Sequence, residues 1–177
     1  MGFLRIVIRR IDSLNEHIGK GVSWLTTALV IVVCFDVFTR YFLKSSSVGV
    51  QEMEWHLFAL IFLLAAAYTL KDDRHVRVDL FYTNFSPKTK AWVDLFGSLF
   101  LLLPFSIVAM LASKQFVLTS FVIRESSPDP GGLPARYLLK AVIPISFALI
   151  VIQVISQIAK SLLTIRAAGA KTPEKSA

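Results

Sequence analysis

The stretch Gln51–Tyr82, QEMEWHLFALIFLLAAAYTLKDDRHVRVDLFY, decides the fold of this chain. It opens with two acids, Glu52 and Glu54, and then carries no Asp, Glu, Lys or Arg from Trp55 to Leu70. A cluster of charged side chains closes it. A helix needs about 20 consecutive, predominantly apolar residues to cross a bilayer. The stretch therefore predicts a transmembrane helix, and the rest of the chain can be placed around it.

The composition of the whole chain agrees with a membrane protein. Of 177 residues, 55% are hydrophobic and only 18% are charged, and the mean hydropathy is +0.64. The charges fall in short clusters between long apolar runs, which is the pattern of membrane spans. We predict an all-α integral membrane protein, in which residues 1–166 form one membrane domain and residues 167–177 a polar tail that we expect to be disordered. Its four transmembrane helices are expected at about residues 22–42, 52–70, 91–112 and 137–163.

Two further helices are expected to lie along the membrane surface. In Phe3–Ile18, apolar residues recur at helical spacing on one face and charged residues on the other, and His75–Phe85 repeats this pattern. Amphipathic helices of this kind lie in the interface and do not span it. A signal peptide does not fit the first segment, because no short apolar core with a small-residue cleavage site follows. A strand would suit the second segment equally well by alternation, but it would leave backbone groups unsatisfied.

The last two spans carry recognisable irregularities. Pro104 predicts a kink in the third span, whose helix is expected to continue to about Ile123. The segment Arg124–Arg136, RESSPDPGGLPAR, contains three prolines and two glycines and predicts an irregular loop. In the fourth span, Gln153 and Gln157 lie four residues apart and begin a polar stripe on one face.

The distribution of basic residues predicts the orientation. The two ends of the chain and the segment between the second and third spans hold 13 of the 19 lysines and arginines, whereas the other side holds six. The positive-inside rule then places both termini in the cytoplasm and the Pro/Gly-rich loop outside.

Asp36 and Arg40 are the most informative charges, because they lie within the first span. A charge at such a place costs about 2.5–3.5 kcal/mol on insertion scales and usually faces protein or water. The pair could form an ion or proton site, or a salt bridge that holds the helix against a neighbour. We favour the salt bridge, because both residues lie near the end of the span, where side chains reach the interface.

Glu52 and Glu54 lie at the start of the second span. They could stabilise the helix N-terminus, or pair with Arg40 or with a partner protein. Because they point about 200° apart around a helix, they cannot face the same surface, and we expect at least one to reach a partner subunit. A metal site with His56 is not expected, since such sites need three or four convergent ligands and the chain has only three histidines.

Other function classes find little support in the sequence. The basic residues flank apolar spans and form no single stripe, so we expect lipid head groups and not nucleic acid as their partner. No nucleophile elbow, phosphate loop, dinucleotide fingerprint or zinc-protease motif occurs. We expect no catalytic residue and no cofactor. Cys34 has no partner for an internal disulfide, and we expect its thiol to be buried and inert.

Several motifs follow one another in the order of a known family. They are Arg40-Tyr41 at the end of the first span, Q-E-x-E-W-H-L-F at Gln51–Phe58, A-A-Y-T-L-x-x-D-x-H-V-R-V-D at Ala66–Asp79, L-L-P-F at Leu102–Phe105, E-S-S-P-D-P-G-G-L-P-A-R at Glu125–Arg136, and Gln153. Over nearly its whole length, the chain resembles the small membrane subunit of TRAP transporters, the DctQ-type family.

The resemblance implies a tripartite transporter in the cell inner membrane. In such a system a periplasmic protein captures an organic acid, and a large membrane subunit moves it in an elevator motion driven by sodium. The small subunit surrounds the immobile scaffold of the large one. The candidates for contacts within the chain or with the large subunit are then Asp36, Arg40, Glu52, Glu54, Gln153 and Gln157.

An alternative is a self-sufficient small transporter that works as a dimer of four-span chains. Such a protein needs an acid near the middle of the membrane, and Asp36 lies too near the end of its span. The two possibilities differ in purification: a subunit co-purifies with a much larger membrane protein, whereas a small transporter self-associates and catalyses counterflow alone.

Overall fold

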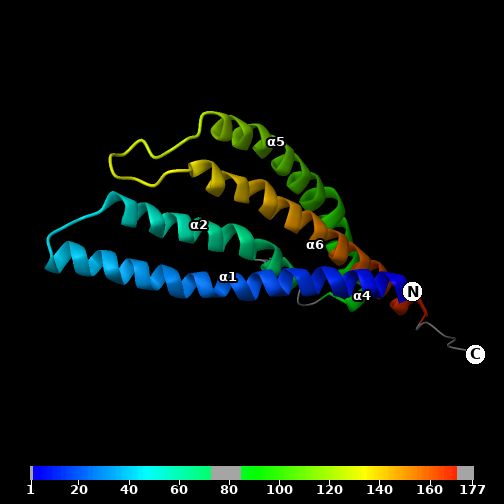
Figure 1. Ribbon diagram of the computed structural model, residues 1–177. Coiled ribbons are helices and arrows are strands. Elements are labelled where there is room, and N and C mark those ends of the chain that lie inside the picture. Colours follow the sequence, from blue (N-terminus) through cyan, green and yellow to red (C-terminus); the bar gives the residue numbers. More distant parts are fainter. Residues whose placement is uncertain (1, 73–84, 171–177) are drawn as a thin grey trace, which may run out of the picture.

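The computed structural model describes residues 2–72 and 85–170, and all of its regular structure is helical (Figure 1). Four helical segments are long and apolar enough to cross a membrane: Leu4–Phe42, Val48–Lys71, Pro87–Val122 and Arg136–Ala167. The predicted all-α fold with four such helices is confirmed. The elements are α1 (Gly2–Phe42), α2 (Val48–Lys71), α4 (Pro87–Phe96), the π-helix η1 (Gly97–Leu102), α5 (Leu103–Val122) and α6 (Arg136–Ala170).

Figure 1 shows the long helices spreading from the end of the molecule at which α1 begins and α6 ends. We call this the terminal end. The loops that join α1 to α2 and α5 to α6 lie together at the opposite end, which we call the loop end. Helix α6 contacts α1, α2, α4, η1 and α5, so it is the central helix of the bundle.

The first helix differs from the sequence prediction. Helix α1 is continuous over 41 residues, about 60 Å at 1.5 Å per residue, so the prediction of a separate surface helix over Phe3–Ile18 is wrong. The side of α1 that enters the bundle there carries Asn15, Gly19 and Val22, all buried, whereas Leu14 is exposed. The predicted polar face therefore divides along its length, with Arg5 and Arg9 exposed and Asp12 half-buried, while most of the predicted apolar face is half-buried. The second predicted surface helix, His75–Phe85, lies outside the described residues except for its last position.

The most deeply buried positions of the described residues are polar more often than apolar. Buried positions include several serines together with Asn15, Gln153 and Asp36, whereas large apolar side chains such as Trp24 and Val122 are more than 70% exposed. Cys34 belongs to this exposed surface, so the prediction of a buried thiol is wrong. Small and polar residues at helix contacts, with apolar residues outside, are the arrangement expected in lipid, because the bilayer gives no driving force to bury leucines.

Small residues let the helices approach closely. A Cβ atom at Gly19 would lie 2.8 Å from the Cβ of Tyr68, so glycine is needed where α2 packs on α1. Ser146 of α6 donates a hydrogen bond of 2.5 Å to the carbonyl oxygen of Leu63 in α2. Such contacts between helices replace the apolar core of a soluble bundle.

The third span begins at a capped turn and contains a π-helix. Ser86 accepts a hydrogen bond of 3.2 Å from the amide of Thr89, and Pro87 occupies the first turn, where its missing N–H costs nothing. Farther along, the amide of Leu103 bonds to the carbonyl of Ser98, five residues back. A π-turn therefore lies just before Pro104, and because helices bend both at prolines and at π-turns, the kink at Pro104 stays a prediction that this turn supports. As predicted, the helix continues well beyond residue 112, and Ile123 caps it.

Candidate functional site

At the loop end, the carboxylate of Glu52 holds the loop between α5 and α6. Its Oε2 atom accepts a hydrogen bond of 2.6 Å from the amide of Leu133, and Oε1 accepts one of 2.5 Å from the hydroxyl of Ser127. Arg136 lies 3.5 Å from Oε1. Glu52 is only 4% exposed. We call these four residues the loop-end cluster, because together they fix the loop over the first turns of α2.

The loop has the backbone geometry that this contact requires. Gly131 has φ of +83°, a left-handed conformation that glycine adopts readily. A Cβ atom on Gly132 would lie 2.8 Å from Oε2 of Glu52, and one on Gly49 would lie 3.1 Å from the carbonyl oxygen of Gly131. The amide of Arg136 bonds to the carbonyl of Glu125 at 2.9 Å and closes the loop at its base. The predicted irregular loop is thus a compact Ω-type loop with both ends together.

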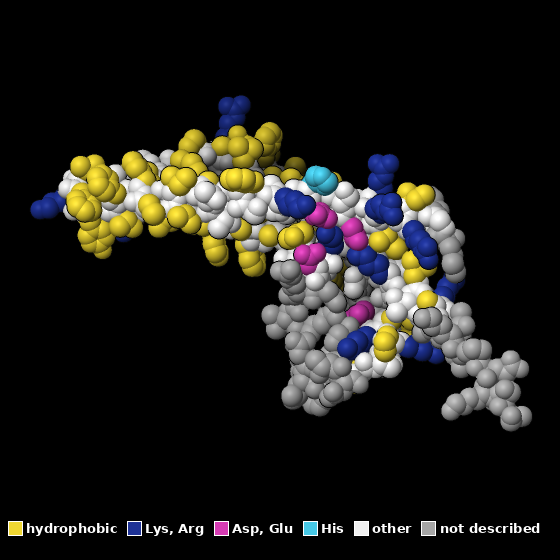
Figure 2. Space-filling view, turned by 90° about the horizontal axis from the view of Figure 1, so that it is seen from below, with side chains coloured by type: hydrophobic (Ala, Val, Ile, Leu, Met, Phe, Trp, Pro, Cys, Tyr) yellow, Lys and Arg dark blue, Asp and Glu magenta, His cyan; other side chains and the backbone are white. Residues whose placement is uncertain are grey.

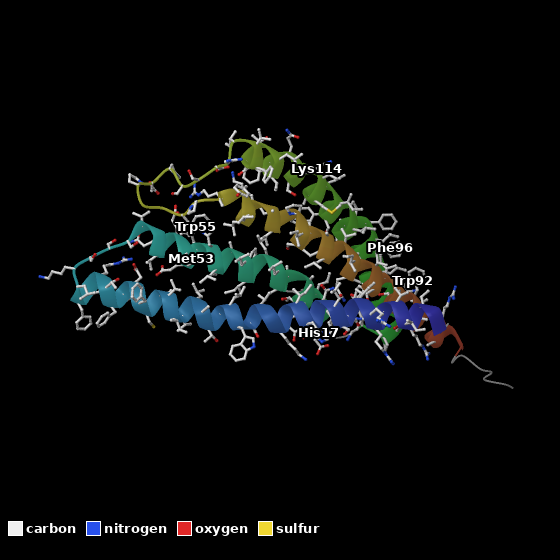
Figure 3. The ribbon with its side chains drawn as sticks, viewed as in Figure 1. His17, Met53, Trp55, Trp92, Phe96 and Lys114 are labelled. Carbon is white, nitrogen blue, oxygen red and sulfur yellow. The ribbon has the colours of Figure 1, made fainter. Side chains whose placement is uncertain are left out.

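Aromatic and charged side chains flank the cluster. The Arg136 guanidinium carbon lies 5.3 Å from the centre of the Trp55 ring, within the range of a cation–π contact; Figure 3 shows Trp55 near the loop end of α2. On the α6 side, Lys140 forms an ion pair with Glu125 and lies 4.1 Å from the centre of the Phe116 ring. The Lys140 ammonium holds the pKa of Glu125 below its ordinary value of 4.5. Both contacts tie the loop to its neighbouring helices.

The ion pair predicted between Asp36 and Arg40 is present within α1. Asp36 is 2% exposed, and in the described part of the chain its second carboxylate oxygen has no hydrogen-bond partner. Glu54 is half-buried, and one of its oxygens is likewise buried without a hydrogen bond to any described residue. Glu52 does not turn to Arg40 and does not cap α2, because α2 already begins at Val48.

At the terminal end, α1 and α6 share a buried polar network that we call the terminal-end cluster. Gln153 is fully buried; it accepts a hydrogen bond of 2.7 Å from Asn15 and donates one of 3.0 Å to Asp12. Asp12 also accepts a hydrogen bond of 2.9 Å from Ser156 and pairs with Lys160 at 2.7 Å. Of the polar stripe predicted on the fourth span, Gln153 therefore lies at the contact with the first helix.

A second ion-pair group lies beside this cluster. Glu16 of α1 pairs with Lys71 at the end of α2 at 2.8 Å, and with Lys20 one turn along α1 at 2.7 Å. Gln157, the other candidate on α6, is half-buried and faces a small hollow that Pro87 and Asp94 of α4 also line. It takes no part in the terminal-end cluster.

These arrangements are suited to holding helices together and not to chemistry. Within residues 2–72 and 85–170, no three His, Cys, Asp or Glu residues gather as metal ligands would. His17 points away from the bundle (Figure 3), and its Nδ1 lies 2.7 Å from the carbonyl oxygen of Ser13. The polar groups mostly satisfy one another, as buried polar groups in membrane helices must.

Comparison with known families agrees with this architecture. The family described as Tripartite ATP-independent periplasmic transporters, DctQ component, matches residues 29–164. The chain belongs to the DctQ family. It is therefore a transporter component and not an enzyme. Searches of curated proteins and of solved structures gave no match. The matched range includes the loop-end cluster of this DctQ component and the α6 half of its terminal-end cluster.

Sequence reasoning missed two parts of these clusters. Asp12 was predicted on the polar face of a surface helix and Asn15 was not singled out, although their spacing with Gly19 matches the stripe at Gln153 and Ser156. The contribution of Ser127 was also missed, because a serine in a Pro/Gly-rich loop is usually a turn former. The sequence held a signal in both cases. The first helix and the fourth span each carry a polar face, and two such faces can pair. Glu52 lies at an apolar span and needs hydrogen-bond donors, which Ser127 can supply.

Proposed function

We propose that this DctQ component is an auxiliary scaffold for the large membrane subunit of a tripartite, binding-protein-dependent transporter of organic acids driven by a sodium gradient. Its partners are then the large subunit, the periplasmic substrate-binding protein and the lipid bilayer. The observation that carries the scaffold role is the distribution of polar and apolar side chains. Several of the buried polar side chains bind other helices or loops of the same chain, while many large apolar side chains are exposed and can contact lipid or another membrane protein.

We further propose that the terminal end faces the cytoplasm and that the protein resides in the inner membrane. The excess of lysine and arginine at the two ends of the chain and between the second and third spans supports this orientation. Reporter fusions after Lys88 and after Ser127 test it. The first should report cytoplasm and the second periplasm, and the reverse result would exclude the orientation.

Glu54 is the residue that we propose to meet the large subunit. A carboxylate in an apolar span is costly unless it finds a partner, and Glu54 makes no ion pair or hydrogen bond to a described residue. Glu52, the other candidate, already has its partners inside the chain. The two acids point about 200° apart around α2. Glu52 therefore points into the chain, and Glu54 points toward a basic or amide group of the large subunit.

Co-purification with the large subunit, together with uptake in membrane vesicles, tests the scaffold role. Glu54→Gln should reduce the co-purified large subunit by roughly tenfold or more, as expected when one partner of an interfacial polar contact is removed. Asp129→Asn is the matched control, because it removes an exposed acid at the same end. If Glu54→Gln assembles like the control, Glu54 is not the docking acid.

The same preparations separate the scaffold role from the alternative. The wild-type chain alone should show no counterflow activity in proteoliposomes, and activity should require the large subunit. Counterflow by the chain alone would favour a small homodimeric transporter. Normal assembly of Glu54→Gln with loss of sodium dependence would place Glu54 in transport itself.

A further inference from the structure

An open pocket of about 680 Å³ lies at the terminal end, between α1, the last residue of α2 and α6. This volume falls in the range of small-molecule sites, about 300–1,000 Å³. Figure 2 shows basic and acidic side chains gathered at this end, whereas hydrophobic side chains predominate at the other. The charged residues that line the pocket are Arg5, Arg9, Lys71, Lys160, Asp12 and Glu16.

Both acids of the pocket are already neutralised by its lysines. Asp12 pairs with Lys160 at 2.7 Å, and Glu16 pairs with Lys71 at 2.8 Å. The lysines are thereby held in fixed positions at the pocket wall. Because four basic residues face two acidic ones, the pocket keeps an excess of two positive charges.

The excess charge resides on Arg5 and Arg9. They lie four residues apart on one side of α1, both exposed, and neither forms an ion pair with any residue that the structure describes. A second hollow, of about 320 Å³, lies beside Arg5, Arg9 and Arg10. Guanidinium groups bind phosphate oxygens through two parallel hydrogen bonds, so the uncompensated pair is suited to a phosphate group.

The surroundings favour a phosphate that is attached to a lipid. Ile8 and Leu163 add apolar wall to the pocket. Ile6, which lines the second hollow beside the arginines, is 60% exposed, which suits contact with acyl chains. Trp24, exposed on α1 and the type of residue found at membrane interfaces, lies on the loop-end side of the pocket. The pocket therefore lies on the head-group side of the bilayer interface.

We infer that this pocket binds the phosphate head group of an anionic phospholipid, with Arg5 and Arg9 as the phosphate ligands. Lys71 and Lys160, held by Glu16 and Asp12, form the rest of the wall. The site is independent of the proposed scaffold role, since it needs only the described helices and a membrane that contains anionic lipid. This binding role accounts for the basic residues that α1 carries ahead of its apolar span.

Native mass spectrometry of the full-length chain in detergent, with added palmitoyl-oleoyl-phosphatidylglycerol, tests this site. The wild-type chain should retain one lipid preferentially over phosphatidylcholine. The double variant Arg5→Gln/Arg9→Gln should bind it roughly 30-fold more weakly, the scale expected for two cations at a membrane surface. The matched control is Lys88→Gln/Arg166→Gln, which removes two exposed charges at the same end but outside the pocket, and should change binding less than twofold.

Two competition experiments distinguish a lipid phosphate from a soluble phosphate compound. Glycerol 3-phosphate and inorganic phosphate at millimolar concentration should not displace the lipid. Displacement at these concentrations would show that the pocket takes a soluble phosphate compound and would overturn the lipid assignment. Equal loss of lipid in the pocket and control variants, or equal retention of phosphatidylcholine and phosphatidylglycerol, would overturn the site itself.

Discussion

Replacing Gln153 by leucine should destabilise the protein far more than the same replacement at Gln157. The Gln153 amide is fully buried and joins Asp12 and Asn15 across the α1–α6 contact. Leucine is similar in size, so no cavity forms, but the hydrogen bond to a charged acceptor is lost and the Asn15 amide is left without its acceptor. Hydrogen bonds to charged groups contribute about 1.5–3 kcal/mol, and an orphaned buried donor costs about 1–3 kcal/mol.

The lower ends of these two ranges apply in a membrane protein, because interhelical hydrogen bonds there contribute only about 0.6 kcal/mol on average. We therefore expect Gln153→Leu to lower the free energy of unfolding by about 2 kcal/mol. Gln157→Leu should change it by less than about 0.5 kcal/mol, because Gln157 is only half-buried and is outside the network. The assay is reversible unfolding in mixed micelles with increasing dodecyl sulfate, followed by circular dichroism.

A double-mutant cycle with Asn15→Leu sharpens the test. Each single variant deprives one further buried polar atom of its partner, Nδ2 of Asn15 or Oε1 of Gln153, whereas the double variant removes both. The double variant should therefore lose less stability than the sum of the two single losses, by at least about 0.5 kcal/mol. Additive losses, or equal losses at Gln153 and Gln157, would refute the view that this network holds α1 to α6.

Two further predictions concern packing and pH. Gly19→Ala should destabilise the protein by about 1–3 kcal/mol in the same assay, because its Cβ would overlap Tyr68, whereas Gly21→Ala, which meets nothing within 4 Å, should be neutral or slightly stabilising; equal effects would contradict the packing. The Lys140 ammonium lowers the pKa of Glu125 in the folded protein below its ordinary value of 4.5. The pair therefore stabilises the loop fully at a pH above 4.5, and this stabilisation is lost as the pH falls through the folded pKa. Hydrogen exchange of the loop amides, corrected for intrinsic rates, should accelerate at acidic pH in the wild type but not in Lys140→Gln, and a parallel response in both would count against the pair.

Much of the fold could be predicted from the sequence, because apolar length is a strong signal. The four long helices, the irregular loop near residues 124–136 and the pair of Asp36 with Arg40 follow from hydropathy, turn residues and helical spacing. These features depend on local chemistry and on the thickness of a bilayer, neither of which requires knowledge of the neighbouring helices.

The remaining features depend on which face of a helix meets protein. An amphipathic segment such as Phe3–Ile18 has the same pattern whether its polar side meets water or another polar helix. Only the position of Gln153 opposite Asn15 decides between these cases. Likewise, Glu52 could have capped its helix, paired with Arg40 or bound a partner, and the choice depends on where a loop some 80 residues later returns.

The π-helix in the third span determines which face of the following helix, α5, points into the bundle. Ser98 and Ser106 are both buried, yet eight residues apart they would lie about 80° from each other around a regular helix at about 100° per residue. One residue accommodated in the π-turn reduces their effective separation to seven and brings them to within about 20° of one face. Deleting a single residue from Gly97–Leu102 should therefore leave the inward face of α5 in register and merely convert the turn to α-helix. A deletion four residues farther along would instead rotate all of the helix beyond it by about 100° and present its lipid-facing side to α6.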